Sequence, residues 1–243
     1  RNLNASVSKC LSGEVVNDTD YAMAANGTYF RTDRRGVLPS IVTAYYSERV
    51  NVKNKMIEAQ KKLEKSGKSY EVERDINRYE NQQMAIKILL NSLYGALGNQ
   101  YFRYFDMRIA EGITLSGQLS VLSAEKSINQ YLNNVLKTDK DYVIAIDTDS
   151  VYLNLKDLVE KTYPNNSKED TVKYLDKVCS QAIEPVITKS FDDLYKQMGG
   201  YENRMVMGRE AIADRGVWTA KKRYILNVHN NEGVQYAEPK MKI

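Results

Sequence analysis

The chain has 243 residues, enough to bury a substantial core as one large domain or two smaller ones. Its 35 lysines and arginines exceed its 31 aspartates and glutamates by four, which points only weakly to a polyanionic partner. The single histidine, His229, and two distant cysteines, Cys10 and Cys179, exclude a multi-histidine metal centre, a CxxC zinc site and a disulfide framework.

The first predicted element is a β-hairpin around Asn26-Gly27. Strand-like residues, YAMAA and TYF, flank this pair. Both residues tolerate the positive φ of a type I′ turn, so we expect such a turn here.

Two long helices are predicted next. Positions spaced alternately four and three apart form a heptad-like stripe, and a second stripe follows the break at Gly67. The stripes comprise Leu38, Val42, Tyr45, Arg49, Val52, Met56, Ala59 and Leu63, and then Val72, Ile76, Tyr79, Gln83, Ile86, Leu90 and Leu93. We expect an antiparallel helical hairpin, or arm, that turns near residues 66–69.

In such an arm, residues equidistant from the turn lie level with each other. Arg49 and Lys53 precede the turn by about as much as Lys87 and Asn91 follow it. This placement indicates a cradle for a triphosphate, with forked donors from arginine and point charges from lysine. Simple solvation remains the interpretation for the other lysines of the arm, Lys55, Lys61, Lys62 and Lys65.

The second helix ends in a polar face. Lys87, Asn91 and Tyr94 are spaced i, i+4 and i+7 and therefore share one side of the helix. Gly95 has no Cβ, which would let a flat substrate such as a base pair approach the backbone. An ordinary helix C-terminus is the alternative interpretation.

The rest of the chain alternates helices and strands. Residues 107–136 predict an amphipathic helix that packs beneath the strands that follow it. Ser167, with Asp170 three positions later, predicts a helix N-cap, and Pro185 predicts a kink or break further on. Additional strands are expected at residues 204–213, 222–228 and 233–237.

Residues 142–155, YVIAIDTDSVYLNL, hold two carboxylates between apolar runs. The β-branched and aromatic types predict a hairpin with Asp147-Thr148-Asp149-Ser150 at its tip. Because side chains alternate along a strand, Asp147 and Asp149 can point the same way, where only cations or water relieve their repulsion. Such hard oxygen ligands suit Mg²⁺ and a phosphate-bearing substrate, whereas a solvated Asp/Ser turn is the alternative.

Three segments together resemble DNA polymerases of family B, the polymerase α-like family. KILLNSLYG at residues 87–95 resembles their fingers motif, DTDS at 147–150 their metal-binding palm motif, and KKRY at 221–224 their primer-strand motif. The stretches NSLYGALGNQYFRYFDMR and YAEPKMKI are similar to the replicative polymerases of T4-like bacteriophages. The resemblance extends from about Tyr21 onward.

This resemblance implies a role for each matching residue. Asp147 would coordinate two catalytic Mg²⁺ ions, with Asp149 as the second acidic position and Glu210 as a further acid beside them. The residues implied to bind the incoming deoxynucleoside triphosphate (dNTP) are Arg49, Lys53, Lys87, Asn91, Tyr94 and Gly95. Those implied to hold primer-template DNA near its minor groove are Lys221, Lys222 and Tyr224.

The resemblance also implies an α+β fold, in which helices back an antiparallel palm sheet and a two-helix fingers hairpin is inserted. The expected domains are an N-terminal palm piece at 1–36, the fingers at 37–98 and the palm at 99–243. The family's other palm aspartate motif, its exonuclease domain and its thumb are not recognised in the sequence. We therefore expect those parts in cis or from another chain, and no activity from these 243 residues alone.

The predicted function is DNA-directed DNA synthesis, in which a primer 3′-hydroxyl attacks the α-phosphate of a dNTP. The sequence has no run of about 18 apolar residues and no signal-peptide pattern, so we expect a non-secreted viral protein in the host cytoplasm, without a membrane partner. One alternative is a non-catalytic nucleic-acid-binding or interaction fragment with a coiled-coil arm. Another is a nucleotide-sugar transferase, which would not need the KKRY segment.

Overall fold

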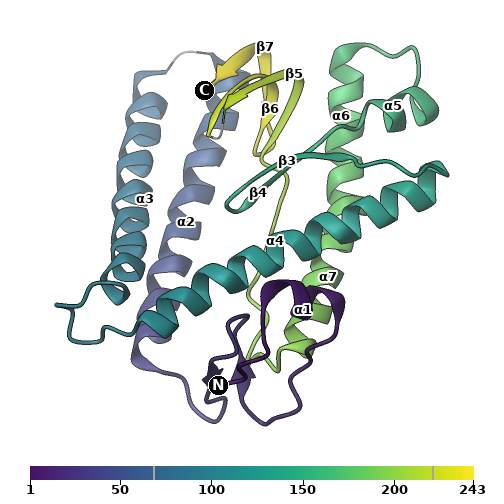
Figure 1. The fold of residues 1–243 in the computed structure, drawn as a ribbon. Helices are drawn as coiled ribbons and strands as arrows, with labels where there is room; N and C mark the ends of the chain where they lie inside the picture. The colour runs from purple at the N-terminus through teal and green to yellow at the C-terminus, as the bar shows by residue number, and fades with distance from the viewer. Residues whose placement is uncertain (68, 221) are drawn as a thin grey trace. The chain divides into compact units, whose positions relative to one another are not determined.

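The computed structural model describes residues 1–67, 69–220 and 222–243. Helices and antiparallel strands both occur, which confirms the predicted α+β class (Figure 1). In chain order the elements are α1 (Val7–Ser12), β1 (Ala22–Met23), β2 (Tyr29–Phe30), α2 (Val37–Ser66), α3 (Tyr70–Leu97), α4 (Met107–Leu136), β3 (Val143–Asp147), β4 (Ser150–Leu153), α5 (Lys156–Thr162), α6 (Lys168–Val178), a π-helical turn (Cys179–Ile183), α7 (Glu184–Gln197), β5 (Ala211–Ala220), β6 (Arg223–Asn231) and β7 (Val234–Lys242).

Contacts between Cα atoms divide the chain into two units. The first unit comprises Arg1–Thr32, Glu111–Ile212 and Val217–Tyr224. The second comprises Asp33–Ala110, Ala213–Gly216 and Ile225–Ile243. The described strands form three small sheets, β1-β2, β3-β4 and β5-β6-β7, rather than the one palm sheet that the resemblance implies.

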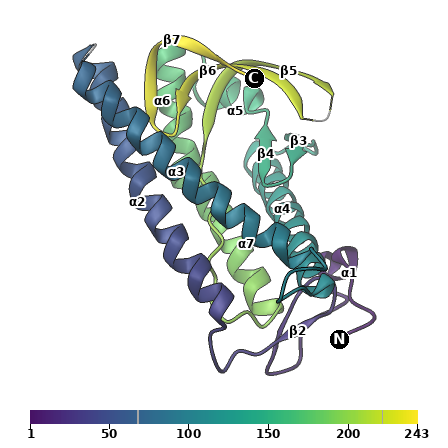
Figure 2. The same cartoon turned by 90° about the vertical axis from the view of Figure 1, so that its left-hand side faces the viewer.

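The arm of the second unit consists of α2 and α3, which lie side by side in both views (Figures 1 and 2). The connection between the helices falls at the predicted position, and Gly67, with φ 79°, follows the last residue of α2. The predicted stripes supply the buried side chains Val52, Met56, Gln83 and Ile86, so the periodicity is confirmed. Long as these helices are, no helix in the described part of the chain is apolar enough to span a membrane.

The hairpin of β6 and β7 belongs to the second unit from Ile225 onward. Its turn has positive φ at both Glu232 (49°) and Gly233 (80°), the signature of a type I′ turn. Two ion pairs join this hairpin to α2, Lys240 with Glu64 at 2.7 Å and Lys53 with Glu232. The strands predicted at 222–228 and 233–237 form this hairpin, which lies against the arm.

In the first unit, α4 supports the β3–β4 hairpin as predicted. Ile128 and Leu132 of α4 are each 1% exposed and share a core with Tyr142 and Val143 at the start of β3. Phe191 of α7, which comes later in the chain, belongs to the same core. Full burial of each such side chain contributes about 1.5–3 kcal/mol, so this core holds the base of the hairpin firmly.

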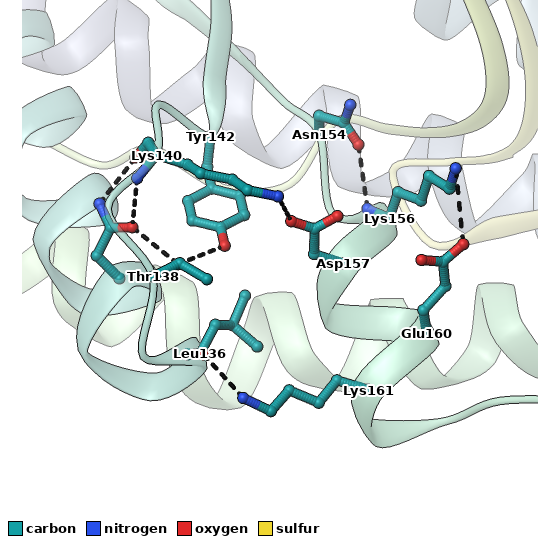
Figure 3. A network of polar contacts seen from close by, with 10 residues as sticks. Leu136, Thr138, Lys140, Tyr142, Asn154, Lys156, Asp157, Glu160 and Lys161 are labelled. Carbon is teal, nitrogen blue, oxygen red and sulfur yellow. Dashed lines mark hydrogen bonds and ion pairs between the residues drawn. The ribbon is translucent and has the colours of Figure 1, made fainter.

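Polar contacts secure the loop that leads from α4 into β3 (Figure 3). The Asn133 amide brackets Lys140, accepting from its backbone N–H at 2.9 Å and donating to its carbonyl at 2.8 Å. Lys140 Nζ pairs with Asp157 of α5 at 2.5 Å, and the hydroxyls of Thr138 and Tyr142 lie 2.8 Å apart. The entry into β3 is thus tied to both neighbouring helices.

The segment from α6 to α7 shows the predicted cap, and its backbone stays helical, with a π-helical turn in place of a break. Ser167 Oγ accepts a hydrogen bond from the Asp170 backbone N–H at 3.1 Å and donates one to its carboxylate at 2.7 Å. Pro185 is the second residue of α7 and has no backbone N–H to donate to the preceding turn, whose backbone is helical up to Ile183. The π-helical turn at Cys179–Ile183 directly precedes it.

The predicted strand at residues 204–213 is wrong for most of its length, because β5 begins only at Ala211. In the segment before Ala211, polar groups form hydrogen bonds with side chains of α7. Asn203 binds Asp192 of α7 at 2.5 Å, and the Arg209 backbone N–H donates to Glu184 at 2.8 Å. These contacts tie the segment to helices instead of to a neighbouring strand.

The first predicted hairpin forms, but its turn is not type I′. Gly27 alone of the pair has positive φ, at 76°. Its backbone N–H donates to the Ala24 carbonyl at 2.7 Å, and a Cβ at Gly27 would lie 2.0 Å from the Asn2 carbonyl oxygen. Close packing against the N-terminal segment, rather than the turn type alone, therefore requires glycine here.

Candidate active site

The aspartate turn joins β3 to β4 and is built by local contacts. Asp147 pairs with Ser150, and Thr148, with φ 55°, occupies the left-handed region that a β-branched residue rarely adopts. The Asp149 backbone N–H reaches the Asp147 carbonyl at 2.6 Å, and Thr148 Oγ1 donates to the Asp147 carboxylate at 3.0 Å. Strained backbone of this kind is concentrated at functional sites.

The two carboxylates differ in setting. Asp147 ends β3 and is half-buried, whereas Asp149 lies in the turn and is exposed. The two side chains were predicted to share a face because side chains alternate along a strand. This reason does not apply to Asp149, which lies outside β3. Ser150 Oγ lies 3.4 Å from the Asp149 carboxylate, so each aspartate has a neighbouring hydroxyl.

Three aromatic rings lie beside this turn. Tyr152 of β4 meets Trp218 of β5 with ring centroids 5.3 Å apart at 77°, and Tyr224 of β6 at 5.5 Å and 60°. These edge-to-face contacts are favourable arrangements of aromatic rings. A pocket of about 370 Å³ opens next to the rings, and its walls include Asp147 and Lys222.

Tyr152 reports the electrostatics of the site. Burial, the neighbouring Tyr224 hydroxyl, and the negative charges of Asp147 and Glu210 raise the pKa of Tyr152 above its ordinary value. Tyr152 therefore stays a neutral phenol at working pH. Glu210, just before β5, is one of the charges that raise the pKa of this phenol.

The acidic residues offer the donors that a magnesium ion prefers. Carboxylate oxygens of Asp147, Asp149 and Glu210 are hard ligands, and Mg²⁺ retains several waters instead of requiring a closed protein cage. In the described part of the chain, no three acidic, histidine or cysteine side chains converge into a complete metal cluster. The residues present thus fit a divalent cation as part of a ligand set.

Of the KKRY segment, Lys222 lies between β5 and β6, and Arg223 and Tyr224 begin β6; these described residues are called the KKRY turn. Lys221 lies outside the described residues. Lys222 is exposed, adopts φ 61° and lines the pocket shared with Asp147, while Tyr224 is half-buried against Tyr152. Two of the three predicted DNA-binding residues are thus brought beside the aspartate turn.

The α2 side of the predicted cradle is engaged within the second unit. Arg49 is half-buried in the stripe, and its Nε is buried without a hydrogen-bond partner among the residues that the structure describes. Lys53 forms its ion pair with Glu232. Neither cation projects freely into water.

The α3 side of the cradle is open. Lys87 and Asn91 are exposed, and Tyr94 is 45% exposed. A Cβ placed on Gly95 would meet no described atom within 4 Å, so the backbone there is accessible. Lys87, Asn91 and the backbone at Gly95 are thus accessible from solvent on this face.

Sequence reasoning missed both Tyr152 and Trp218. Trp218, the chain's only tryptophan, is 36% exposed at the edge of the site. The available signal was the position of Tyr152 in the short strand that follows Asp149, where its side chain can face only the pocket or the core. The partners of both rings come from distant segments and have no sequence signature.

Comparison with known proteins identifies the class. The sequence model of DNA polymerase family B matches residues 2–198. This span is more than half of the chain, so the chain belongs to DNA polymerase family B. It includes the arm and the aspartate turn and ends before Glu210 and the KKRY segment.

The particular similarity is to phage polymerases. The DNA-directed DNA polymerase of Escherichia phage RB69 is 33% identical in an alignment 274 residues long. The alignment covers 92% of this chain and 30% of that protein. That of Enterobacteria phage T4 is 34% identical over 275 residues, covering 92% and 31%. The DNA polymerase alpha catalytic subunit of Dictyostelium discoideum is 27% identical over 107 residues, covering 44% and 6%.

These alignments confirm the predicted resemblance to the T4-like polymerases. Because 92% of the chain is more than residues 2–198, both phage alignments continue past the family match. The chain spans less than a third of the length of either phage relative.

Proposed function

We propose that this chain is part of a DNA-directed DNA polymerase, which transfers a nucleotide from a dNTP to a primer 3′-hydroxyl. One observation carries the proposal: a single pocket is lined by Asp147, which ends the strand before the acidic turn, and by Lys222 of the KKRY turn. A polymerase must hold the metal-binding carboxylates and the primer end together. Membership of family B and the names of the phage relatives support this activity.

Asp147 and Asp149 would hold the divalent cations, which we propose to be two Mg²⁺ ions, with Glu210 beside them. When bound, such ions activate the attacking hydroxyl and stabilise the charge on the departing pyrophosphate. Thr148 Oγ1 would orient the Asp147 carboxylate through their 3.0 Å hydrogen bond. Lys222 and Tyr224 would bind the primer-template beside this turn, together with Lys221.

The arm would bind the incoming dNTP. Lys87, Asn91, Tyr94 and Gly95 form an exposed face of α3 that supports contacts to the triphosphate and the nascent base pair. Arg49 and Lys53 would add donors from α2. On this proposal, residues 37–98 act as fingers, and residues 1–36 and 99–243 as palm.

Asp147 and Asp149 would form one wall of a two-metal site. Two metal ions held side by side need carboxylate ligands beyond these two. We propose that the remaining polymerase parts, including the other palm aspartate motif, a thumb and an exonuclease domain, act in cis or from another chain. These 243 residues by themselves would then bind Mg²⁺ weakly and would not extend a primer.

Primer extension by this chain combined with those parts tests the function. Asp147→Asn should lower kcat on the order of a thousandfold or more, as loss of a catalytic group does, while leaving the assembly intact. Asp193→Asn, an equal charge change at an exposed position of α7, is the matched control and should extend primers normally.

Two results would each count against a part of the proposal. Full activity of the Asp147→Asn enzyme would remove the aspartate turn from the reaction. Robust extension by the 243-residue chain alone would contradict only the proposed need for further carboxylates and would leave the polymerase function standing.

A further inference from the structure

Strand pairing places Tyr152 on the same face of the hairpin as Asp147. Asp147 pairs with Ser150, and Ala145 pairs with Tyr152. Directly paired residues point the same way, and residues two apart on a strand share a face, so these four side chains share one face. Tyr152 is therefore the diagonal neighbour of Asp147, at a Cα separation of roughly 7–8 Å and a somewhat shorter Cβ separation.

The opposite face of the hairpin has a different task. Val151 and Leu153 pack against the core that contains Tyr142 and Val143. Tyr152, between them in sequence, is consequently directed away from that core and toward the pocket, which it lines together with Asp147. Its ring is not needed to fill the main core of the first unit.

Trp218 and Tyr224 bring the ring of Tyr152 into contact with two further strands. Trp218 approaches it edge-on from β5, and Tyr224 from β6, while the Trp218 and Tyr224 centroids are 6.5 Å apart. Lys222 lies between Trp218 and Tyr224 in sequence, at the turn that these two strands form. The three rings thus connect the KKRY turn to the strand that leaves the aspartate turn.

The chemistry of the rings suits a position beside carboxylates. Tyr152 stays neutral, so the cluster adds no negative charge next to Asp147 and Glu210. Aromatic rings are also rigid, with two side-chain torsions, so contact between them defines a geometry better than aliphatic contact would. Trp218 remains 36% exposed at the pocket wall, which is more than a purely structural core residue requires.

We propose that Tyr152 and Trp218 are positioning residues, whose ring contacts with Tyr224 hold the KKRY turn at a fixed distance from the aspartate turn. The inference rests on the proposed polymerase function and adds two residues to it. Neither residue touches the reacting atoms. They act through Tyr224 and Lys222, which would carry the primer end to the metal-binding carboxylates.

The expected effect follows from the sensitivity of catalysis to alignment. Trp218→Leu and Tyr152→Leu should each lower kcat for primer extension up to about a hundredfold, since a displacement near 1 Å has that effect. The KM for dNTP should change less than about twofold, because the dNTP-binding residues are unaltered. Trp218→Phe and Tyr152→Phe keep a ring in place and should recover most of the lost kcat.

The variants are made in the polymerase assembled from this chain and its remaining parts. Tyr163→Leu is the matched control, because Tyr163 stacks on Tyr174 at 4.6 Å elsewhere in the first unit. It should lower the melting temperature without changing kcat. Trp218 is partly exposed, so Trp218→Leu decides the question by itself if Tyr152→Leu does not fold.

Unchanged kcat in Trp218→Leu would overturn the positioning role, as would an equal rise in the KM for dNTP or a failure of phenylalanine to restore kcat. Asp147→Asn is measured in parallel to separate this inference from the function beneath it. If Asp147→Asn is inactive while Trp218→Leu is normal, the polymerase function stands and only the positioning role fails. If Asp147→Asn is fully active, the function itself fails.

Discussion

The aspartate turn and the arm hold their charged residues in different ways. In the aspartate turn, Asp147 has a hydroxyl donor one residue away and three aromatic rings beside it, on a hairpin anchored by α4 (Figure 3 shows the loop at its base). In the arm, the four polar residues predicted to form the cradle have different surroundings. Arg49 is half-buried in the helix interface, Lys53 is paired with Glu232, and Lys87 and Asn91 are exposed.

The difference concerns preorganisation. Local hydrogen bonds and ring contacts give the aspartate turn one arrangement before any substrate binds, and a preorganised site does not have to reorganise during the reaction. The cations of the arm would all contact a triphosphate only after it binds. For this, Lys53 would have to leave its ion pair with Glu232. Closing of an arm on its substrate is a common way to couple binding to catalysis.

The largest effect within the arm is expected from Lys87→Ala. Lys87 is exposed and ready to bind, so its removal should raise the KM for dNTP about tenfold to a hundredfold, the value of a charge-assisted hydrogen bond. Steady-state primer extension and a separate measurement of primer-template affinity check this, and the DNA affinity should not change. Lys55→Ala, the same charge change at another exposed site of the arm, should leave the KM unaltered. A matching loss of DNA affinity would contradict the cradle.

Arg49→Leu should separate stability from function. The buried Nε of Arg49 has no partner in the described residues, so its replacement should stabilise the assembled enzyme by about 1 kcal/mol, or about 2–4 °C in melting temperature. Use of dNTP should nevertheless decline, because the forked donor is lost. Thermal melting and kinetics of the same preparation check both effects. A lower melting temperature would mean that Arg49 is a structural residue of the interface.

The smallest effect is expected from Glu232→Gln. This change releases Lys53 from a partly exposed ion pair worth up to about 1 kcal/mol, so the KM for dNTP should fall by about fivefold at most. The control is Glu64→Gln, which breaks the other ion pair between α2 and β7, that of Glu64 with Lys240. This variant should not alter the KM for dNTP. If both variants behave alike, the Lys53–Glu232 pair serves only to attach β6–β7 to α2.

Periodic and local signals in the sequence predicted much of the fold. The amphipathic helix at 107–136 coincides with α4, and the cap at Ser167 forms as expected, because both depend on residues within a few positions of each other. The prediction failed at 204–210, where contacts from α6 and α7 replace strand pairing. The placement of Asp149 was uncertain for a related reason, since the end of a strand cannot be read from its residue types.

The assignment of site residues depended on resemblance more than on pattern. The acidic turn, the polar face of α3 and the KKRY turn were each ambiguous alone, and a solvated turn or an ordinary helix end explained any one of them. Their joint match to family B resolved the class, which the family comparison confirms. The two rings inferred to position Tyr224 carried no such motif and emerged only from their contacts.

The sequence by itself determined the α+β class, the two long helices of the arm, the acidic turn and the family, because periodicity, turn chemistry and motifs are properties of neighbouring residues. Only the tertiary structure decided which charged groups are engaged. Lys53 and Glu232 lie 179 positions apart, and Tyr152 meets Trp218 and Tyr224 from separate strands. Such pairings depend on how the chain brings distant backbone segments together, and a side chain's type does not specify its distant partner.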